Sequence, residues 1–324
     1  MSGQAGEVAV LDLAPERGDF RAELIDGLTK SPRFLPCKYF YDETGSELFL
    51  KICELPEYYI TRTELRILRD NAEEIAATLG PGVELIGFGT GAGTKTRLLI
   101  SHLEDPVAYI PVDISKDQLV ESSATFSRDF PTMDVLPVCA DYLQPLVLPA
   151  ALRPAHKRVV YFPGSTIGNF EPRDAEIFLQ RIAEICGRGG ALLIGVDLQK
   201  EAAIIENAYN DSAGVTASFN LNILARANRE LDANFDLDLW VHRAIYDAKI
   251  GRIEMHLISK AYQTANIGPE TFVFEEGEHL ITEFSYKYSV AGFTQMARSV
   301  GMKFERLWTD EAQLFGLFLF QVVI

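Results

Sequence analysis

The stretch Val83-Glu-Leu-Ile-Gly-Phe-Gly-Thr-Gly-Ala-Gly-Thr-Lys-Thr96 decides how this 324-residue chain folds. Its first residues, 83–88, form an apolar run that predicts a buried strand, and the apolar residues of 94–103 recur at helical spacing. Glycines stand at alternate positions between the two, so the backbone can adopt positive φ and a ligand can approach it closely. The first amides of a helix point at whatever lies in front of them, which favours a nucleotide-like ligand at this turn.

The glycine pattern alone leaves alternatives open. Residues Gly87 to Ala92 fit G-x-G-x-x-A, but such a match is weak by itself, and glycine-rich loops are often nothing more than turns. A P-loop is excluded, because its lysine must directly follow the second glycine and here Thr94 stands between Gly93 and Lys95. The stretch therefore predicts half of a βαβ unit and excludes a Walker-type ATPase.

Length and charge limit the class of protein. With 48% hydrophobic residues, the chain can bury a core of one large or two smaller domains. Its formal net charge of −16 repels phosphate backbones and anionic membrane surfaces, so we expect neither nucleic acid nor a membrane as a partner. The first residues lack the pattern of a secretory signal, and the apolar stretch 314–324 is too short to span a bilayer, so we interpret it as a core strand.

Cysteine and histidine spacing predicts neither disulfides nor a metal site. The four cysteines contain no CxxC pair, and a chain of this length does not need disulfides to fold, so we expect reduced thiols and a cytoplasmic protein. The five histidines show no HExxH motif and no ligand spacing with cysteine. We therefore predict no protein-bound metal.

Strands and helices alternate after the glycine turn. Further strands are expected at 107–113, 135–142 and 191–197, and another in 158–170 that runs into a loop of small polar residues. A helix is expected at 172–186, ended by the glycines at 187, 189 and 190. Such alternation implies a doubly wound α/β fold with a parallel sheet, whose ligands bind at the carboxyl ends of the strands. Four candidate residues stand at such ends: Gly89, Asp113, Asp141 and Asn169.

The rhythm changes after residue 200, where helical stretches are followed by several strands before the α/β pattern returns near 290. We therefore predict a Rossmann-like domain of residues 62–199 plus 287–324, and a second α+β domain of residues 1–61 plus 200–286. In the expected strand near 278–285, alternation puts Glu283 and Ser285 on one face. The pattern alone favours a structural role for Glu283, as a charge that keeps an edge strand soluble, over a functional one.

Two cofactor classes share the glycine turn and the acid that follows the second strand. Asp113 lies where such an acid would bind ribose hydroxyls, in a nicotinamide dehydrogenase or in an S-adenosylmethionine-dependent methyltransferase. After the third strand, the acid Asp141 suits hydrogen bonding to the edge of an adenine, and the aromatic Tyr142 suits packing against its face. No histidine or lysine in these loops is a candidate for hydride chemistry. Together with seven predicted strands ending in an antiparallel hairpin, this favours the methyltransferase.

Motifs along nearly the whole chain resemble the histidine Nα-methyltransferases of ergothioneine biosynthesis. They occur in the right order at Tyr39-Phe-Tyr-Asp42 with Gly45-Ser46, Leu55-Pro-Glu-Tyr-Tyr59 with Thr61-Arg-Thr-Glu64, Gly164-Ser-Thr-Ile-Gly-Asn169, Asp211 to Asn222, Asn228 to Asp238, Arg252-Ile-Glu-Met255 and Thr282-Glu-Phe-Ser285. The chain departs from the family at the glycine turn, where Gly87 and Thr90 replace an acidic residue and a serine, and in the segment leading to Lys95.

The resemblance implies roles for individual residues. Asn169 and Tyr209 would hold the α-carboxylate and amino group of the substrate, with Tyr58 beside them. Glu283, Ser285 and Tyr41 would read the imidazole, and Met255 would pack in the same pocket. S-adenosylmethionine would be bound by Gly89, Lys95, Asp113, Asp141 and Tyr142.

The expected activity is S-adenosylmethionine-dependent methylation of the α-amino group of L-histidine, three times, to give hercynine. We expect a monomer. The nearest alternative is an α-N-methyltransferase for another amino acid such as tryptophan, although the presence of Glu283, Ser285 and Met255 argues against it. A non-catalytic amino-acid-binding protein with the same fold is the alternative from a different class.

Overall fold

The computed structural model describes residues 9–14, 18–89, 91 and 93–324, which divide into two compact units. Unit 1 comprises residues up to 17, 63–198 and 288–324; unit 2 comprises residues 18–62 and 199–287. Thr90 and Ala92 of the glycine turn lie outside the described residues. The two units are taken in turn.

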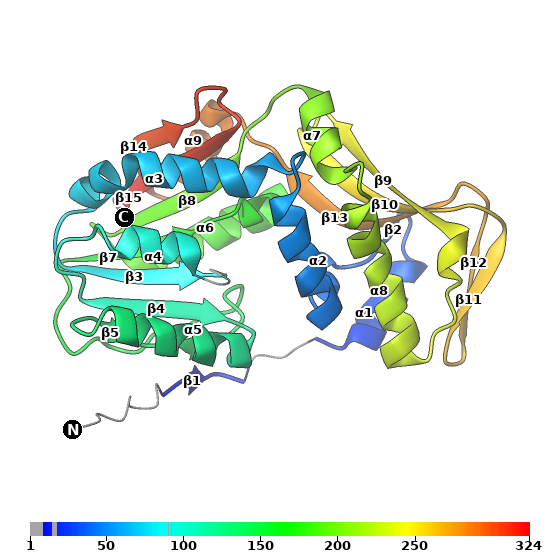
Figure 1. Ribbon diagram of the computed structural model, residues 1–324, viewed down its shortest axis with the longest axis horizontal. Helices are drawn as coiled ribbons and strands as arrows, with labels where there is room; N and C mark the ends of the chain where they lie inside the picture. Colours follow the sequence, from blue (N-terminus) through cyan, green and yellow to red (C-terminus); the bar gives the residue numbers. More distant parts are fainter. Residues whose placement is uncertain (1–8, 15–17, 90, 92) are drawn as a thin grey trace. The chain divides into compact units, whose positions relative to one another are not determined.

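Within the described ranges, unit 1 holds a sheet of nine strands in the order β1-β6-β4-β3-β7-β8-β15-β14, with β5 beside β4 (Figure 1). Its strands are β1 (Leu11–Asp12), β3 (Val83–Phe88), β4 (Ala108–Asp113), β5 (Asp134–Val135), β6 (Val138–Cys139), β7 (Lys157–Phe162), β8 (Ala191–Asp197), β14 (Met302–Thr309) and β15 (Phe315–Val322). All six residues of β3 are buried, which explains its apolar run, since a central parallel strand is covered on both faces.

The order of the strands makes the sheet doubly wound. The chain moves outward from β3 through α4 (Thr94–Ile100) and α5 (Lys116–Asp129) to β4 and β6, then returns to β7 on the other side of β3 and continues through α6 (Pro172–Cys186) to β8. Because such crossovers are right-handed, reversal of direction puts α6 on the opposite face from α4 and α5. The carboxyl ends of β3 and β7 flank the switch point, where doubly wound sheets bind ligands.

The last two strands complete the methyltransferase version of this sheet. Helix α9 (Val290–Ser299) precedes β14, and β15 runs antiparallel to both β8 and β14. The predicted seven-stranded sheet is therefore confirmed, with two additional two-residue strands, β1 and β5, near one edge.

Two expectations for unit 1 need correction. The single strand expected at 135–142 is two short strands, β5 and β6, and Asp141 and Tyr142 follow the second one. The predicted domain bounds placed residues 1–61 together, whereas β1 pairs with β6 of the large sheet, because the backbone of Leu11 and Leu13 donates to Pro137 and Cys139. Elsewhere the agreement is close: β3, α6 and β8 have the bounds expected from the sequence.

Unit 2 is built on a four-stranded sheet in the order β2-β13-β10-β9. Its elements are α1 (Phe20–Thr29), β2 (Arg33–Phe34), η1 (Cys37–Phe40), α2 (Glu43–Glu54), the first residues of α3 (Tyr59–Leu79), α7 (Ala202–Tyr209), α8 (Val215–Leu231), η3 (Leu237–Leu239), β9 (Trp240–Asp247), β10 (Arg252–Ser259), β11 (Gln263–Ile267), β12 (Glu270–Phe274) and β13 (His279–Tyr286). Strand β13 is antiparallel to β10 and parallel to the short β2, so it is an inner strand. The β11–β12 hairpin was not predicted.

None of the helices within the described ranges is long and apolar enough to cross a bilayer.

Candidate functional site

The glycine turn of unit 1 presents open backbone at the end of β3. Gly89, Gly91 and Gly93 all have positive φ, at 56°, 54° and 73°, a conformation that residues with a Cβ rarely adopt. Apart from its chain neighbours, no described residue has an atom within 4 Å of a Cβ added to Gly91, and a Cβ added to Gly89 would meet the Tyr142 side chain, 3.7 Å away. This space beside exposed backbone can accept a ligand.

The two acids expected to bind the cofactor follow neighbouring strands. Asp113 ends β4, and its carboxylate accepts the Ser115 backbone N–H at 2.9 Å. Burial raises the pKa of Asp113, and the Ser115 hydrogen bond opposes that rise. Asp141 follows β6, next to β4, and accepts the Leu143 N–H at 2.8 Å. Tyr142 stacks on Phe88 of β3, with ring centroids 5.5 Å apart.

Lys95 has a partner that sequence analysis did not identify. Its ammonium forms an ion pair with the carboxylate of Glu64, which is fully buried in unit 1. The same carboxylate accepts the backbone N–H of Gly164 at 3.0 Å and 3.1 Å. Glu64 therefore links α3, the first turn of α4 and the loop after β7.

Asn169 ends a strained loop in unit 1. It closes η2 (Thr166–Asn169), and Ser165, directly before η2, is a non-glycine residue with φ of 61°. The Ser165 hydroxyl accepts the Asp197 N–H at 2.8 Å, and its carbonyl accepts the Gly168 N–H at 2.9 Å. A costly backbone conformation held in this way is typical of functional loops.

In unit 2, two neighbouring strands present the remaining predicted residues on one face of the sheet. Met255 of β10 lies directly opposite Glu283 of β13, and Ile253 lies opposite Ser285. Paired residues of antiparallel strands share a face, and residues two apart do too. Glu283, Ser285 and Met255 therefore point to the same side, and all three are buried.

Aromatic rings connect the other predicted residues of unit 2. The rings of Tyr58 and Tyr209 are 6.2 Å apart, Phe49 lies 6.4 Å from Tyr58, and Tyr41 lies 5.6 Å from Phe49. The Tyr209 hydroxyl donates to Ser285 Oγ at 3.2 Å. The structure thus brings together Tyr41, Tyr58, Tyr209, Met255, Glu283 and Ser285 in unit 2, whereas Asn169 belongs to unit 1.

Glu283 is a buried acid without a hydrogen-bond donor among the described residues. It is 8% exposed, and burial raises its pKa from 4.5 to about 7, against the opposing effect of the Lys287 ammonium. Burial raises the pKa of the Tyr58 hydroxyl well above 10, and the Glu283 charge adds to that rise, whereas Tyr41 is 45% exposed. Its position on the inner strand β13 shows that Glu283 is not an edge-strand charge. A carboxylate in such surroundings can accept a hydrogen bond from a ligand.

Lys287 is a member of this cluster that sequence analysis missed. Its ammonium donates to Ser285 Oγ at 2.8 Å and to Tyr209 Oη at 3.0 Å, and the residue is 2% exposed. The alternation that placed Glu283 and Ser285 on one face continues to residue 287, so the sequence did contain a signal for it.

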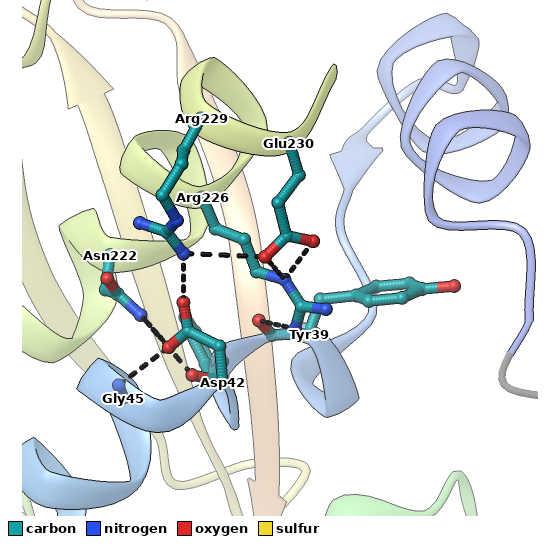
Figure 2. A network of polar contacts seen from close by, with 8 residues as sticks. Tyr39, Asp42, Gly45, Asn222, Arg226, Arg229 and Glu230 are labelled. Atoms are coloured by element: carbon teal, nitrogen blue, oxygen red, sulfur yellow. Dashed lines mark hydrogen bonds and ion pairs between the residues drawn. The ribbon is translucent and has the colours of Figure 1, made fainter. Parts of the chain in front are cut away.

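A polar network holds the segment that carries Tyr41, as Figure 2 shows. The Asp42 carboxylate caps α2 by accepting the Gly45 N–H at 2.7 Å, and it also binds the Asn222 amide at 2.8 Å and Arg229. Arg226 donates to the Tyr39 carbonyl at 3.0 Å. Because these contacts come from one face of α8, they fix the backbone on both sides of Tyr41.

The described residues contain no group of three or more histidine, cysteine or acidic side chains placed to hold a metal ion. What they offer are two kinds of ligand surface. Unit 1 offers open backbone with two acids and an aromatic ring, and unit 2 offers a buried acid, an ammonium and several hydroxyls. The first suits a nucleoside, and the second suits a small zwitterion with a hydrogen-bonding side chain.

Comparisons with known proteins identify the family of this chain. The family described as histidine-specific, S-adenosylmethionine-dependent methyltransferases matches residues 20–322. The histidine N-alpha-methyltransferase of Mycolicibacterium smegmatis is 39% identical over 308 residues, covering 94% of each chain, and that of Mycobacterium tuberculosis is 38% identical, covering 92% of this chain and 94% of the relative. Ergothioneine biosynthesis protein 1 of Neurospora crassa is 29% identical over 86% of this chain, which corresponds to 32% of that protein. This chain therefore belongs to the family of histidine-specific, S-adenosylmethionine-dependent methyltransferases.

Proposed function

We propose that this enzyme methylates the α-amino nitrogen of L-histidine, three times in succession, to give hercynine, the first step of ergothioneine biosynthesis. The observation that carries the proposal is the buried Glu283 carboxylate, which has no described donor of its own and lies among hydroxyls and an ammonium. An imidazole N–H supplies the missing donor. A substrate without that donor leaves the buried acid unpaired, which is costly.

The polar groups and the open backbone of unit 1 suit S-adenosylmethionine as a ligand. The open backbone at Gly89 and Gly91 leaves room for a ligand, Asp113 can accept hydrogen bonds from ribose hydroxyls, and Asp141 with Tyr142 can meet an adenine. When bound, the cofactor supplies an activated methyl group on a sulfonium. We assign Lys95 to the support of this region, since it ties the first turn of α4 to Glu64.

In unit 2 we assign the two ends of the amino acid to different side chains. Tyr209 and Tyr58 hold the carboxylate and amino group, Glu283, Ser285 and Tyr41 hold the imidazole, and Met255 packs against the ring. Asn169 of unit 1 keeps the role at the amino-acid end that the family resemblance gives it.

Positioning accounts for most of the expected rate enhancement, because the amine needs a free lone pair aligned with the methyl group rather than a covalent intermediate. The raised pKa of Tyr58 keeps its hydroxyl protonated at neutral pH, so we assign it as a hydrogen-bonding group and not as a phenolate base.

The decisive experiment is a substrate screen with the purified enzyme and S-adenosylmethionine, read by mass spectrometry. L-histidine should gain about 14, 28 and 42 mass units as one, two and three methyl groups are added to the amine, while L-tryptophan and L-phenylalanine should remain unmodified. Preference for tryptophan would refute the histidine assignment. Calorimetric binding of histidine without turnover would instead favour a non-catalytic binding protein.

We also propose that the enzyme acts as a cytoplasmic monomer. Among the described cysteines, Cys37, Cys139 and Cys186 are free thiols, as expected in a reducing compartment. Light scattering coupled to gel filtration should give the 36.1 kDa mass of a single chain, whereas twice that mass would contradict the proposal.

The network of Figure 2 leads to a prediction about Tyr41. Asn222→Leu removes a buried donor to Asp42 and should lower the free energy of unfolding by about 1–2 kcal/mol, with a several-fold rise in the KM for histidine as the segment around Tyr41 loosens. Arg229→Ala is the matched control, because it removes a donor to the same carboxylate from a side chain that is 51% exposed. Such a surface pair contributes at most about 1 kcal/mol. Equal effects of the two substitutions would contradict the assignment.

A further inference from the structure

Lys287 is a buried ammonium at the centre of the polar cluster in unit 2. It directly follows β13 and is 2% exposed. Removing an ammonium from water costs several kcal/mol unless hydrogen bonds and opposite charge compensate. A lysine in this position therefore calls for an explanation in terms of what surrounds it.

Two hydroxyls of unit 2 accept hydrogen bonds from the ammonium. Lys287 Nζ lies 2.8 Å from Ser285 Oγ and 3.0 Å from Tyr209 Oη, and it lies 4.8 Å from the centre of the Tyr209 ring. The proposed function assigns these hydroxyls to opposite ends of the substrate, Ser285 to the imidazole and Tyr209 to the amino-acid end. A donor that holds both oxygens at once fixes the spacing between them, and an ammonium that donates to Tyr209 also makes its O–H a stronger donor.

The backbone of Lys287 is fixed as well. Its N–H donates to the Gly251 carbonyl at 2.7 Å, where the chain leaves β13. A Cβ added to Gly251, which has φ of 70°, would lie 3.0 Å from the Lys287 carbonyl. The turn before β10 thus fits closely against the residue that carries the ammonium.

The positive charge of Lys287 also lowers the pKa of Glu283, against the effect of burial. The titratable groups for which an interaction with Glu283 is seen include Lys287, the Cys37 thiol, and the Tyr41 and Tyr58 hydroxyls. Burial raises the pKa of the thiol to about 12 and that of the Tyr58 hydroxyl well above 10, and the pKa of Tyr41 is raised too, so all three are neutral at pH 7 to 8. Among these groups, only the ammonium favours the ionised form of Glu283.

We propose that Lys287 is a positioning residue for histidine recognition, because its ammonium fixes the Ser285 and Tyr209 hydroxyls and supplies a positive charge that interacts favourably with the Glu283 carboxylate on the same strand face. This inference rests on the proposed function. Lys287 carries out no step of the methyl transfer itself; it acts through the three side chains that it orients or charges.

The test compares Lys287→Met, which keeps the length and removes the charge, with Lys287→Arg, which keeps the charge. Steady-state kinetics at pH 8 should give a KM for L-histidine about tenfold higher in Lys287→Met, with the KM for S-adenosylmethionine within about twofold of wild type. Lys287→Arg should recover most of the loss. An increase in both KM values, or none in that for histidine, would overturn the proposal.

The titration midpoint of Glu283 provides a second test, because it would not change if Lys287 had only a structural role. In protein labelled with ¹³C at the glutamate carboxyls, the Glu283 signal is assigned by its loss in Glu283→Gln and followed as a function of pH in the absence of ligand. Its midpoint should rise by about one pH unit in Lys287→Met and return in Lys287→Arg, as expected for a neighbouring opposite charge. An unchanged midpoint in Lys287→Met would refute the electrostatic half of the proposal.

The same variants separate this inference from the proposed function. If Glu283→Gln leaves the KM for histidine unchanged, the assignment of Glu283 to the imidazole fails, whatever Lys287→Met does. If Glu283→Gln raises that KM and Lys287→Met does not, only the role of Lys287 fails.

Discussion

Glu283→Gln is expected to stabilise the ligand-free enzyme more at pH 8 than at pH 5, by roughly 2–3 kcal/mol in the free energy of unfolding. The expectation follows from the burial of an acid whose pKa is about 7 in the folded protein, against 4.5 for an ordinary glutamate. The glutamine has nearly the same shape and never ionises. It therefore removes the pH dependence due to this carboxyl and little else.

The direction follows from proton binding. Because the folded pKa is higher than the unfolded one, the folded state binds this proton more tightly, and the stability that it contributes is fully present below about pH 4.5. That contribution is lost as the pH rises through 7. At pH 8 the wild-type protein therefore carries an ionised acid that burial disfavours, whereas the glutamine variant does not.

Urea unfolding of both proteins at pH 5 and pH 8 measures this difference. Taking the difference between the two proteins at each pH cancels the titration of every other group that the substitution leaves alone. An equal effect of the substitution at the two pH values would show that Glu283 has an ordinary pKa. Near-saturating L-histidine should reduce the advantage of the variant at pH 8, because the ligand compensates the wild-type carboxylate.

The same carboxylate should also contribute directly to substrate affinity. Glu283→Ala is expected to weaken histidine binding by about 1.5–3 kcal/mol, the range for hydrogen bonds to charged groups, which is roughly a 10- to 150-fold rise in the dissociation constant. Affinity for S-adenosylhomocysteine should be nearly unchanged, because Gly89, Asp113 and Asp141 belong to unit 1. Calorimetry with each ligand measures both, and an unchanged histidine affinity would remove Glu283 from the substrate site.

The second large effect is expected at Glu64. Glu64→Ala should lower the free energy of unfolding by about 3 kcal/mol, because it leaves the Lys95 ammonium, 19% exposed, and the Gly164 N–H without their shared acceptor. The loop of Ser165 and η2 starts at Gly164, so loss of this anchor should also raise the KM values.

A double-mutant cycle distinguishes the charge from the hydrogen bond at this position. Glu64→Gln keeps a carbonyl for Gly164 and should cost less than alanine, and combining it with Lys95→Met should recover part of the loss, since removing both charges is often nearly neutral. Additive losses in the double variant would mean that Lys95 and Glu64 do not interact energetically.

The architecture of unit 1 follows from local patterns in the sequence. Apolar runs long enough for buried strands, helices stopped at glycine, and the alternation of the two predict the doubly wound sheet, since each of these signals is local. The bounds of β3, α6 and β8 were predictable for this reason, and the resemblance to a family identified six residues that unit 2 does bring together. The β11–β12 hairpin and the break between β5 and β6 were missed because short strands carry weak periodicity.

The partners and the burial of the acids and bases follow instead from contacts between segments that are distant in the sequence. An isolated reading of Glu283 favours an edge-strand charge, and its inner position in the sheet, with Met255 opposite, follows from pairing between distant segments. Lys95 forms an ion pair with Glu64, which lies 31 positions earlier in the chain. The Lys287 ammonium donates to the hydroxyl of Tyr209, which lies 78 positions earlier. Burial and charge pairing depend on what the folded chain places nearby, so no local pattern of residues could assign them.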